Sequence, residues 1–239
     1  MKLVREIIFL FITMIITLII CTLATWWNWN NQITDVQLHD VFFDLLPDLS
    51  HIEYPITNYI LIGHIIVTMM SFKYNHIIQY VAQFIFLQCI LSSIRALSVS
   101  MTILPNIHVY DYCTKEVDNF FQVLAYMIRY GTCGDYMFSG HTVTAFLLYM
   151  FGHKHAINYL WEVLSGILFG AQILFLLLLR WHYSVDILIA MIITWFIFMF
   201  YKRYETLDRW FYFKEFILSE TTKSASQVGS TVRARRIVF

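Results

Sequence analysis

Apolar residues gather into six long runs along the chain, separated by shorter polar segments. The runs cover about residues 7–26, 58–72, 77–104, 138–151, 159–179 and 184–201. A helix of about 20 apolar residues is long enough to cross a bilayer. Several of the runs are shorter than this, so we expect their helices to extend into the flanking polar residues. The pattern predicts an all-α, polytopic membrane protein with six transmembrane helices.

The polar segments divide the chain into three predicted parts. Residues 1–30 form the first transmembrane helix with its short N-terminus, and residues 31–203 form the helical core. Residues 204–239, rich in Ser, Thr and Arg toward their end, form a partly disordered cytosolic tail. Within the core, residues 117–130 have apolar positions at near-helical spacing. They predict either an amphipathic helix on the membrane surface or a packed helix outside the membrane.

Composition supports a membrane protein. Hydrophobic residues make up 59% of the chain and charged residues 13%, whereas about 25% of an average soluble domain is charged. The formal net charge is zero, so no overall field attracts nucleic acid. The four cysteines contain no CxxC pair and are too few for a disulfide scaffold. Cys113 and Cys133 fall in one loop, where we predict a disulfide between them.

Lys and Arg are unevenly distributed between the two ends of the predicted helices. Twelve of the sixteen fall in the N-terminal segment, the loops after the second and fourth runs, or the C-terminal segment. Three lie at the opposite end, and Arg95 lies inside the third run. Cytoplasmic loops of membrane proteins carry the excess of Lys and Arg. This predicts that both termini are cytosolic and that the loops after the first, third and fifth runs are exoplasmic.

Two polar motifs border apolar runs on that exoplasmic side: residues 133–142 (CGDYMFSGHT) and residues 182–186 (HYSVD). His182 and Asp186 are four positions apart, so on a helix they share one face. A carboxylate there would fix the tautomer of the imidazole. A histidine held in this way can attack phosphorus, and His141 can act as general acid and base. The motifs predict a two-histidine phosphoryl-transfer site that needs no metal or cofactor, although each could instead be an interfacial or capping residue.

Four further residues are candidates for substrate binding. Ser139 lies at the start of the fourth run, where its hydroxyl and nearby backbone N–H groups suit phosphate oxygens. Arg95 is expected to bind the lipid phosphate; the alternatives are snorkelling or an ion pair with Asp135. Asp135 is expected to position the first histidine or contact the acceptor, or else to cap the helix. Tyr183 would line the cavity or belong to the interfacial aromatic belt.

The two motifs resemble those of the sphingomyelin synthase family, part of the lipid phosphatase/phosphotransferase superfamily. The family pattern C-G-D-x3-S-G-H-T fits residues 133–142, and H-Y-[ST]-[VI]-D-[VI]-x2-A fits residues 182–190. Weaker similarities at 38–44 and 95–105 extend the resemblance over about residues 35–201. The resemblance implies a helical core like that of the type 2 phosphatidic acid phosphatases. It also implies a Golgi or plasma-membrane protein with an exoplasmic site.

The activity implied by the resemblance is transfer of a phospho-head group from a glycerophospholipid donor to the primary hydroxyl of a ceramide acceptor, with release of diacylglycerol. By the family's mechanism, His182 is the nucleophile, Asp186 its partner and His141 the acid–base group. Trp181 stands where members that make sphingomyelin commonly carry an acidic residue. Choline, ethanolamine and inositol head groups therefore all stay open.

Two alternatives to the transferase are considered. A lipid phosphate phosphatase would use water as the acceptor, but the Arg-Pro pair of that subgroup does not occur in this sequence. A non-enzymatic scaffold or scramblase could keep the same fold. In each case the partners are lipids rather than nucleic acid, and a homo-oligomer is possible.

Overall fold

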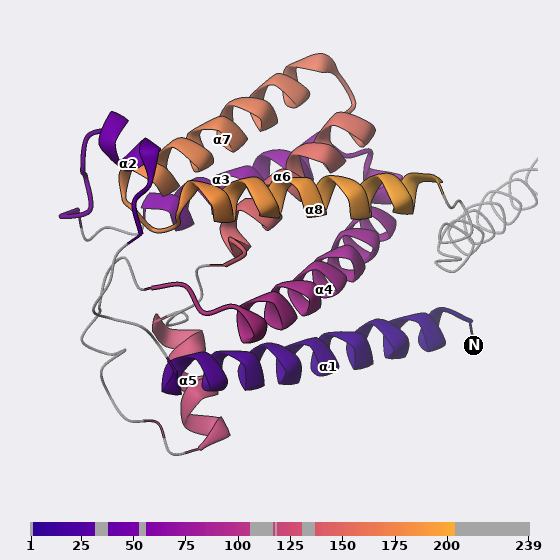
Figure 1. Cartoon of the computed structure of the whole chain (residues 1–239). Coiled ribbons are helices and arrows are strands. Elements are labelled where there is room, and N and C mark those ends of the chain that lie inside the picture. The colour runs from indigo at the N-terminus through magenta and orange to yellow at the C-terminus, as the bar shows by residue number, and fades with distance from the viewer. Residues whose placement is uncertain are drawn as a thin grey trace, which may run out of the picture.

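The computed structural model describes residues 2–31, 38–52, 56–105, 117, 119–130 and 137–203, and within these ranges all regular structure is helical. Figure 1 shows the arrangement of the elements. The helices are α1 (Lys2–Asn30), α2 (Val41–Leu45), α3 (Ile56–Ser71), α4 (Ile77–Met101), α5 (Phe120–Tyr130), α6 (Gly140–His155), α7 (Tyr159–Leu178) and α8 (Ser184–Arg203), with a 3-10 turn η1 (Tyr74–His76) before α4. The predicted all-α fold is confirmed for the described residues.

Each of the six apolar runs coincides with a helix, but not all of these helices are long and apolar enough to span a membrane. By length and composition, α1, α7, α8 and the continuous η1–α4 segment could each cross. The helices α3 and α6 have 16 residues each, which is about 24 Å at 1.5 Å per residue. That is shorter than a hydrocarbon core of about 30 Å. Among the described residues, four helices are supported as membrane spans, and the total of six transmembrane helices stays a prediction.

The position of α6 explains why it is short and less apolar. It packs against α3, α4, α7 and α8, and it lies within the group of helices that they form in Figure 1. A helix covered by protein on most sides does not need a continuous lipid-compatible surface. The central core contains these buried side chains: Leu87, Leu91, Phe138, Val143, Leu147, Phe151, Ala190 and Phe198.

The helix α1 lies on the outside of this group, against α4 and α5. Many of its large apolar side chains are exposed, including Ile8, Phe11 and Ile16. Such a surface is stable against lipid rather than water, as expected for the first predicted span.

The helix α5 confirms the helical segment predicted over residues 117–130. Val123 is fully buried in a cluster with Trp29 of α1, and Tyr126 stacks on Trp29 with ring centroids 5.6 Å apart. These contacts support the packed alternative. Cys113 and Cys133 lie outside the described residues, as does the tail from residue 204, so the disulfide and the three-part division of the chain stay predictions.

The turn after α7 has an unusual backbone. Arg180 has a φ of 53°, in the left-handed region. The Trp181 N–H donates to the Leu176 carbonyl (3.0 Å) and the Arg180 N–H donates to the Leu177 carbonyl (3.1 Å). These two bonds form a Schellman motif, in which glycine is the usual left-handed residue. Because a Cβ there costs roughly 1–2 kcal/mol, the arginine side chain must offer compensating contacts.

Those contacts are made with the segment that contains α2. Arg180 Nη2 donates to the Phe43 carbonyl (3.0 Å), and the guanidinium carbon lies 4.7 Å from the centroid of the Phe43 ring. Arg180 Nε lies 2.9 Å from a carboxylate oxygen of Asp48. The strained turn is therefore tied to α2, and it leads two residues later to His182.

Candidate active site

The start of α8 holds the second motif. His182 is nearly buried and Asp186 is fully buried. His182 Nδ1 lies 3.7 Å from Asp186 Oδ2, which is too long for a hydrogen bond, and the carboxylate attracts the imidazole electrostatically when the ring is protonated. The same carboxylate oxygen accepts the Tyr183 N–H at 3.1 Å, as the third residue of a helix does in a capping box. The capping contact that the sequence offered as an alternative is therefore present, and the orienting role of Asp186 toward His182 stays a prediction.

A second carboxylate fastens the same helix end from a distant part of the chain. Asp40 Oδ2 accepts the Ser184 N–H at 2.6 Å, while its Oδ1 accepts the Phe42 N–H at 2.9 Å. Asp40 therefore joins the start of α2 to the start of α8. This gives a physical reason for the weaker motif at residues 38–44: it positions the turn that carries His182.

Tyr183, predicted to bind substrate, is buried within protein. Its hydroxyl donates to the Pro105 carbonyl (3.3 Å) and accepts the Leu38 N–H (3.2 Å). Burial raises the pKa of Tyr183, and the charges of Asp186 and Asp40 add to this. The phenol stays protonated and can keep donating. These bonds indicate that Tyr183 holds the start of α8 against the segments that contain Leu38 and Pro105. Its contact with substrate stays a prediction.

The start of α6 holds the first motif. Ser139 is the N-cap of α6, and its hydroxyl oxygen accepts from the Thr142 N–H (3.3 Å) and the Thr142 hydroxyl (2.9 Å). His141 Nε2 lies 2.8 Å from Asn58 Oδ1 on α3. Since an amide oxygen can only accept, this contact assigns the proton of a neutral His141 to Nε2 and leaves Nδ1 as the basic nitrogen.

The two histidines lie at the same end of the helical bundle. The ring of His141 meets the ring of Trp181 edge to face, with centroids 5.6 Å apart, and Trp181 directly precedes His182. His182 and Arg95 are both within electrostatic range of His141. The structure therefore brings together the candidates from α4, α6 and α8.

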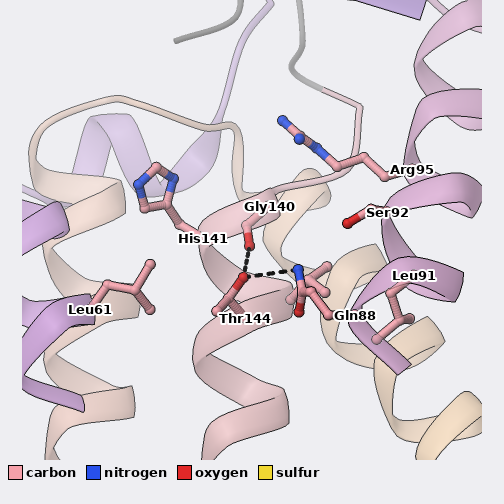
Figure 2. Close-up of a pocket in the computed structure, with 9 residues that line it drawn as sticks. Leu61, Gln88, Leu91, Ser92, Arg95, Gly140, His141 and Thr144 are labelled. Atoms are coloured by element: carbon pink, nitrogen blue, oxygen red, sulfur yellow. Dashed lines mark hydrogen bonds between the residues drawn. The ribbon is translucent and has the colours of Figure 1, made fainter. Parts of the chain in front are cut away.

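A cavity of about 300 Å³ opens beside these groups (Figure 2). Arg95 and His141 flank Gly140 at one end of it in this view, and Arg95 Nε donates to the Phe138 carbonyl at 2.8 Å. Asp135, the alternative partner of Arg95, lies outside the described residues. The cavity is lined by Leu61, Gln88, Leu91, Ser92, Arg95, Gly140, His141, Val143 and Thr144.

Three residues near the site were not predicted from the sequence: Asn58, Trp181 as a contact of His141, and Gln88. Gln88 Nε2 donates to the Thr144 hydroxyl at 3.2 Å. Together with Ser92 and Arg95, Gln88 forms a polar stripe at helical spacing inside an apolar run. This sequence pattern could have identified Gln88 as a candidate site residue. Asn58 carries no such signal, because its role depends on how α3 packs beside α6.

Gly140, at the start of α6, lies close to the Arg95 guanidinium. A Cβ added there would lie 3.1 Å from Arg95 Cζ and Nη1. We expect Gly140→Ala to push the guanidinium aside and to reduce head-group transfer about tenfold, mainly through a higher KM for the phospholipid donor. Steady-state kinetics with the donor varied would measure this. Gly63→Ala is the control, since nothing lies within 4 Å of that added Cβ; an equal loss in both variants would contradict the explanation.

Comparison with known proteins agrees with this geometry. Residues 132–203, which contain both histidines and α6–α8, match the family described as PAP2 superfamily C-terminal. Over 174 residues, 66% of the chain, it is 28% identical to phosphatidylcholine:ceramide cholinephosphotransferase 2 of Macaca fascicularis. Over 181 residues, 69% of the chain, it is 28% identical to phosphatidylcholine:ceramide cholinephosphotransferase 1 of Gallus gallus.

The chain is similar in sequence to sphingomyelin synthases, at modest identity. A shorter stretch of 73 residues, 29% of the chain, is 44% identical to sphingomyelin synthase-related protein 1 of Homo sapiens and covers 17% of that protein. The longer alignments cover 47% and 43% of the two cholinephosphotransferases. The chain therefore spans about half the length of the curated relatives it matches, and the resemblance predicted from its two motifs is confirmed.

Proposed function

We propose that this protein is an integral-membrane ceramide phosphotransferase. It moves a phospho-head group from a glycerophospholipid to the primary hydroxyl of ceramide and releases diacylglycerol. The observation that carries the proposal is the convergence of His141 of α6, Arg95 of α4 and His182, in the turn before α8, at one end of the bundle, where the first two line a cavity. The names of the relatives support the substrate class.

In the first half-reaction, His182 attacks phosphorus through Nε2, because Nδ1 faces Asp186. A bond forms between this nitrogen and phosphorus, and the bond from phosphorus to the glycerol oxygen breaks. Protonated His141 gives its Nδ1 proton to that oxygen, so diacylglycerol leaves as a neutral alcohol. The Arg95 guanidinium binds the phosphate oxygens, and Asp186 stabilises the positive charge that develops on His182.

In the second half-reaction, the primary hydroxyl of ceramide attacks the phospho-histidine. Neutral His141 accepts the hydroxyl proton on Nδ1, which its Nε2–H bond to Asn58 leaves as the basic nitrogen. The phosphorus–nitrogen bond breaks, and His182 is returned in its starting form. Two histidines with exchanging roles thus complete the cycle with protons and bonds in balance.

The topology proposed with this mechanism follows the charge distribution. Both termini would be cytosolic, and the site would face the lumen of the Golgi or the exterior of the plasma membrane. The orientation can be tested with Ser50→Cys, which places a thiol at a partly exposed position between α2 and α3. Labelling of this thiol by a membrane-impermeant reagent is measured in sealed vesicles. In sealed, right-side-out Golgi vesicles, we expect the introduced cysteine to be labelled only after the membrane has been permeabilised.

The activity is tested with purified protein in liposomes that contain fluorescent short-chain ceramide. Donors with choline, ethanolamine and inositol head groups are supplied in parallel without added metal. We expect a fluorescent phospho-ceramide from at least one donor, together with an equal amount of diacylglycerol. Release of free phosphate from phosphatidic acid, with no product from ceramide and any donor, would instead identify a phosphatase. Absence of both reactions would favour the scaffold or scramblase alternative.

A further inference from the structure

A second cavity, of about 490 Å³, lies between the C-terminal halves of α6 and α8. Both helices begin at the catalytic motifs, so this cavity is at the opposite end of the same pair. Lys154 follows His141 by 13 residues on α6, which is about 20 Å along the axis. The cavity is lined by Phe146, Tyr149, Met150, His153, Lys154, Trp195, Phe198, Met199 and Lys202.

The lining has a charged end and an apolar wall. Lys154 Nζ lies 5.3 Å from the centroid of the Tyr201 ring, and Lys202 is exposed in the last turn of α8. His153 Nδ1 lies 2.6 Å from the Glu162 carboxylate of α7, whose negative charge offsets any positive charge on that ring. Two lysines are therefore the main cations that face the cavity.

The apolar wall continues onto the outer surface of α8. Trp195 is 45% exposed and Met199 is 40% exposed, and both also line the cavity. Neighbouring Phe196 and Phe200 are exposed as well. A surface of this kind is covered by acyl chains in a membrane, so the cavity is open to molecules that diffuse within the bilayer.

We propose that this cavity binds one anionic phospholipid, taken from the leaflet opposite the catalytic site. Its phosphate would lie between Lys154 and Lys202, and one acyl chain would pack along Trp195 and Met199. Basic pockets between transmembrane helices near the membrane surface suit such head groups. This site is distinct from the candidate active site at His141 and His182, and lipid binding here does not depend on the transferase activity.

The helix ends themselves make the lysines necessary. The C-terminal carbonyls of α6 and α8 carry partial negative charge, which disfavours an anion nearby. The two ammonium groups must overcome this repulsion as well as hold the phosphate. A zwitterionic lipid gains less from them, because its own cation is repelled by the same lysines. The site should therefore select for net negative charge.

The test is native mass spectrometry of the full-length protein released from detergent micelles. Dioleoylphosphatidylglycerol and dioleoylphosphatidylcholine, which have the same acyl chains, are titrated separately. We expect the anionic lipid to bind at least tenfold more tightly. Lys154→Gln with Lys202→Gln should weaken its binding roughly thirtyfold, from about fivefold per lysine near a membrane surface. The pair Lys154→Arg with Lys202→Arg should retain it.

The matched control is Arg5→Gln with Lys73→Gln. It removes the same charge from the same end of the bundle, in the first turn of α1 and in the turn after α3, but neither residue lines the cavity. Equal weakening in both glutamine pairs would overturn the site in favour of general surface attraction. If the Lys154 variant fails to fold, Lys202→Gln alone should weaken binding about fivefold. Equal affinity for both lipids, or full competition by millimolar glycerol phosphate, would also overturn the proposal.

Discussion

Replacing His182 by alanine is expected to reduce ceramide phosphotransfer to the uncatalysed background, a loss of at least about 10⁴-fold. Loss of a catalytic nucleophile commonly has an effect of this size or larger. The variant should also fail to form the covalent intermediate. This is measured by incubating protein with donor labelled in its phosphate, without ceramide, and counting acid-labile label on the protein. Wild-type protein should incorporate up to one label per chain, and His182→Ala none.

His51→Ala is a suitable control for that experiment. His51 is exposed and lies in the segment before α3, so its removal should change neither activity nor labelling. A melting temperature of His182→Ala within a few degrees of the wild type would show that the loss is chemical. Acid-labile labelling that persists in His182→Ala would contradict the assignment of the nucleophile.

The two histidine motifs could be recognised in the sequence because their spacing is local. A histidine and a carboxylate four residues apart share a helix face wherever that helix lies. The geometry confirms this nearness for His182 and Asp186, and it adds the capping bond to the Tyr183 N–H. The excess of Lys and Arg on the predicted cytosolic side also predicted that both histidines lie together at the opposite end of the helices, and the contact of His141 with Trp181 supports this.

Contacts between distant segments could not be predicted in this way. The bond from Asn58 to His141 joins residues 83 positions apart, and Asp40 caps a helix 144 positions later. Neither residue type is unusual in its local context. The helix α6 also departs from its apolar pattern, since protein rather than lipid surrounds much of it. Hydropathy reports the solvent that a helix meets, and it cannot distinguish lipid from a neighbouring helix.

The left-handed Arg180 illustrates the same limit. Local preference places glycine at such a position, and nothing in the residues around it predicts an arginine there. The side chain reaches Phe43 and Asp48, and these long-range contacts oppose the backbone cost. Since His182 follows two residues later, a locally unfavourable turn helps to position the proposed nucleophile.

Replacing Asp186 by asparagine should separate the two roles of this buried carboxylate. An asparagine oxygen can still accept the Tyr183 N–H, so the cap of α8 and the melting temperature should change little. The neutral amide no longer stabilises a positive imidazole, and its NH₂ group can hold the wrong tautomer of His182. We expect kcat to fall by about 10²–10⁴-fold, the range typical when the carboxylate that orients a catalytic histidine is neutralised.

Asp186→Ala provides the comparison, because it removes both roles. It should lose activity to a similar extent and should also destabilise the protein by about 1 kcal/mol, the usual cost of a lost helix cap. Thermal unfolding in detergent and transfer kinetics on both variants would separate the effects. If Asp186→Asn kept activity within threefold of the wild type while Asp186→Ala lost stability, the carboxylate would serve α8 alone, and His182 would be oriented by other contacts.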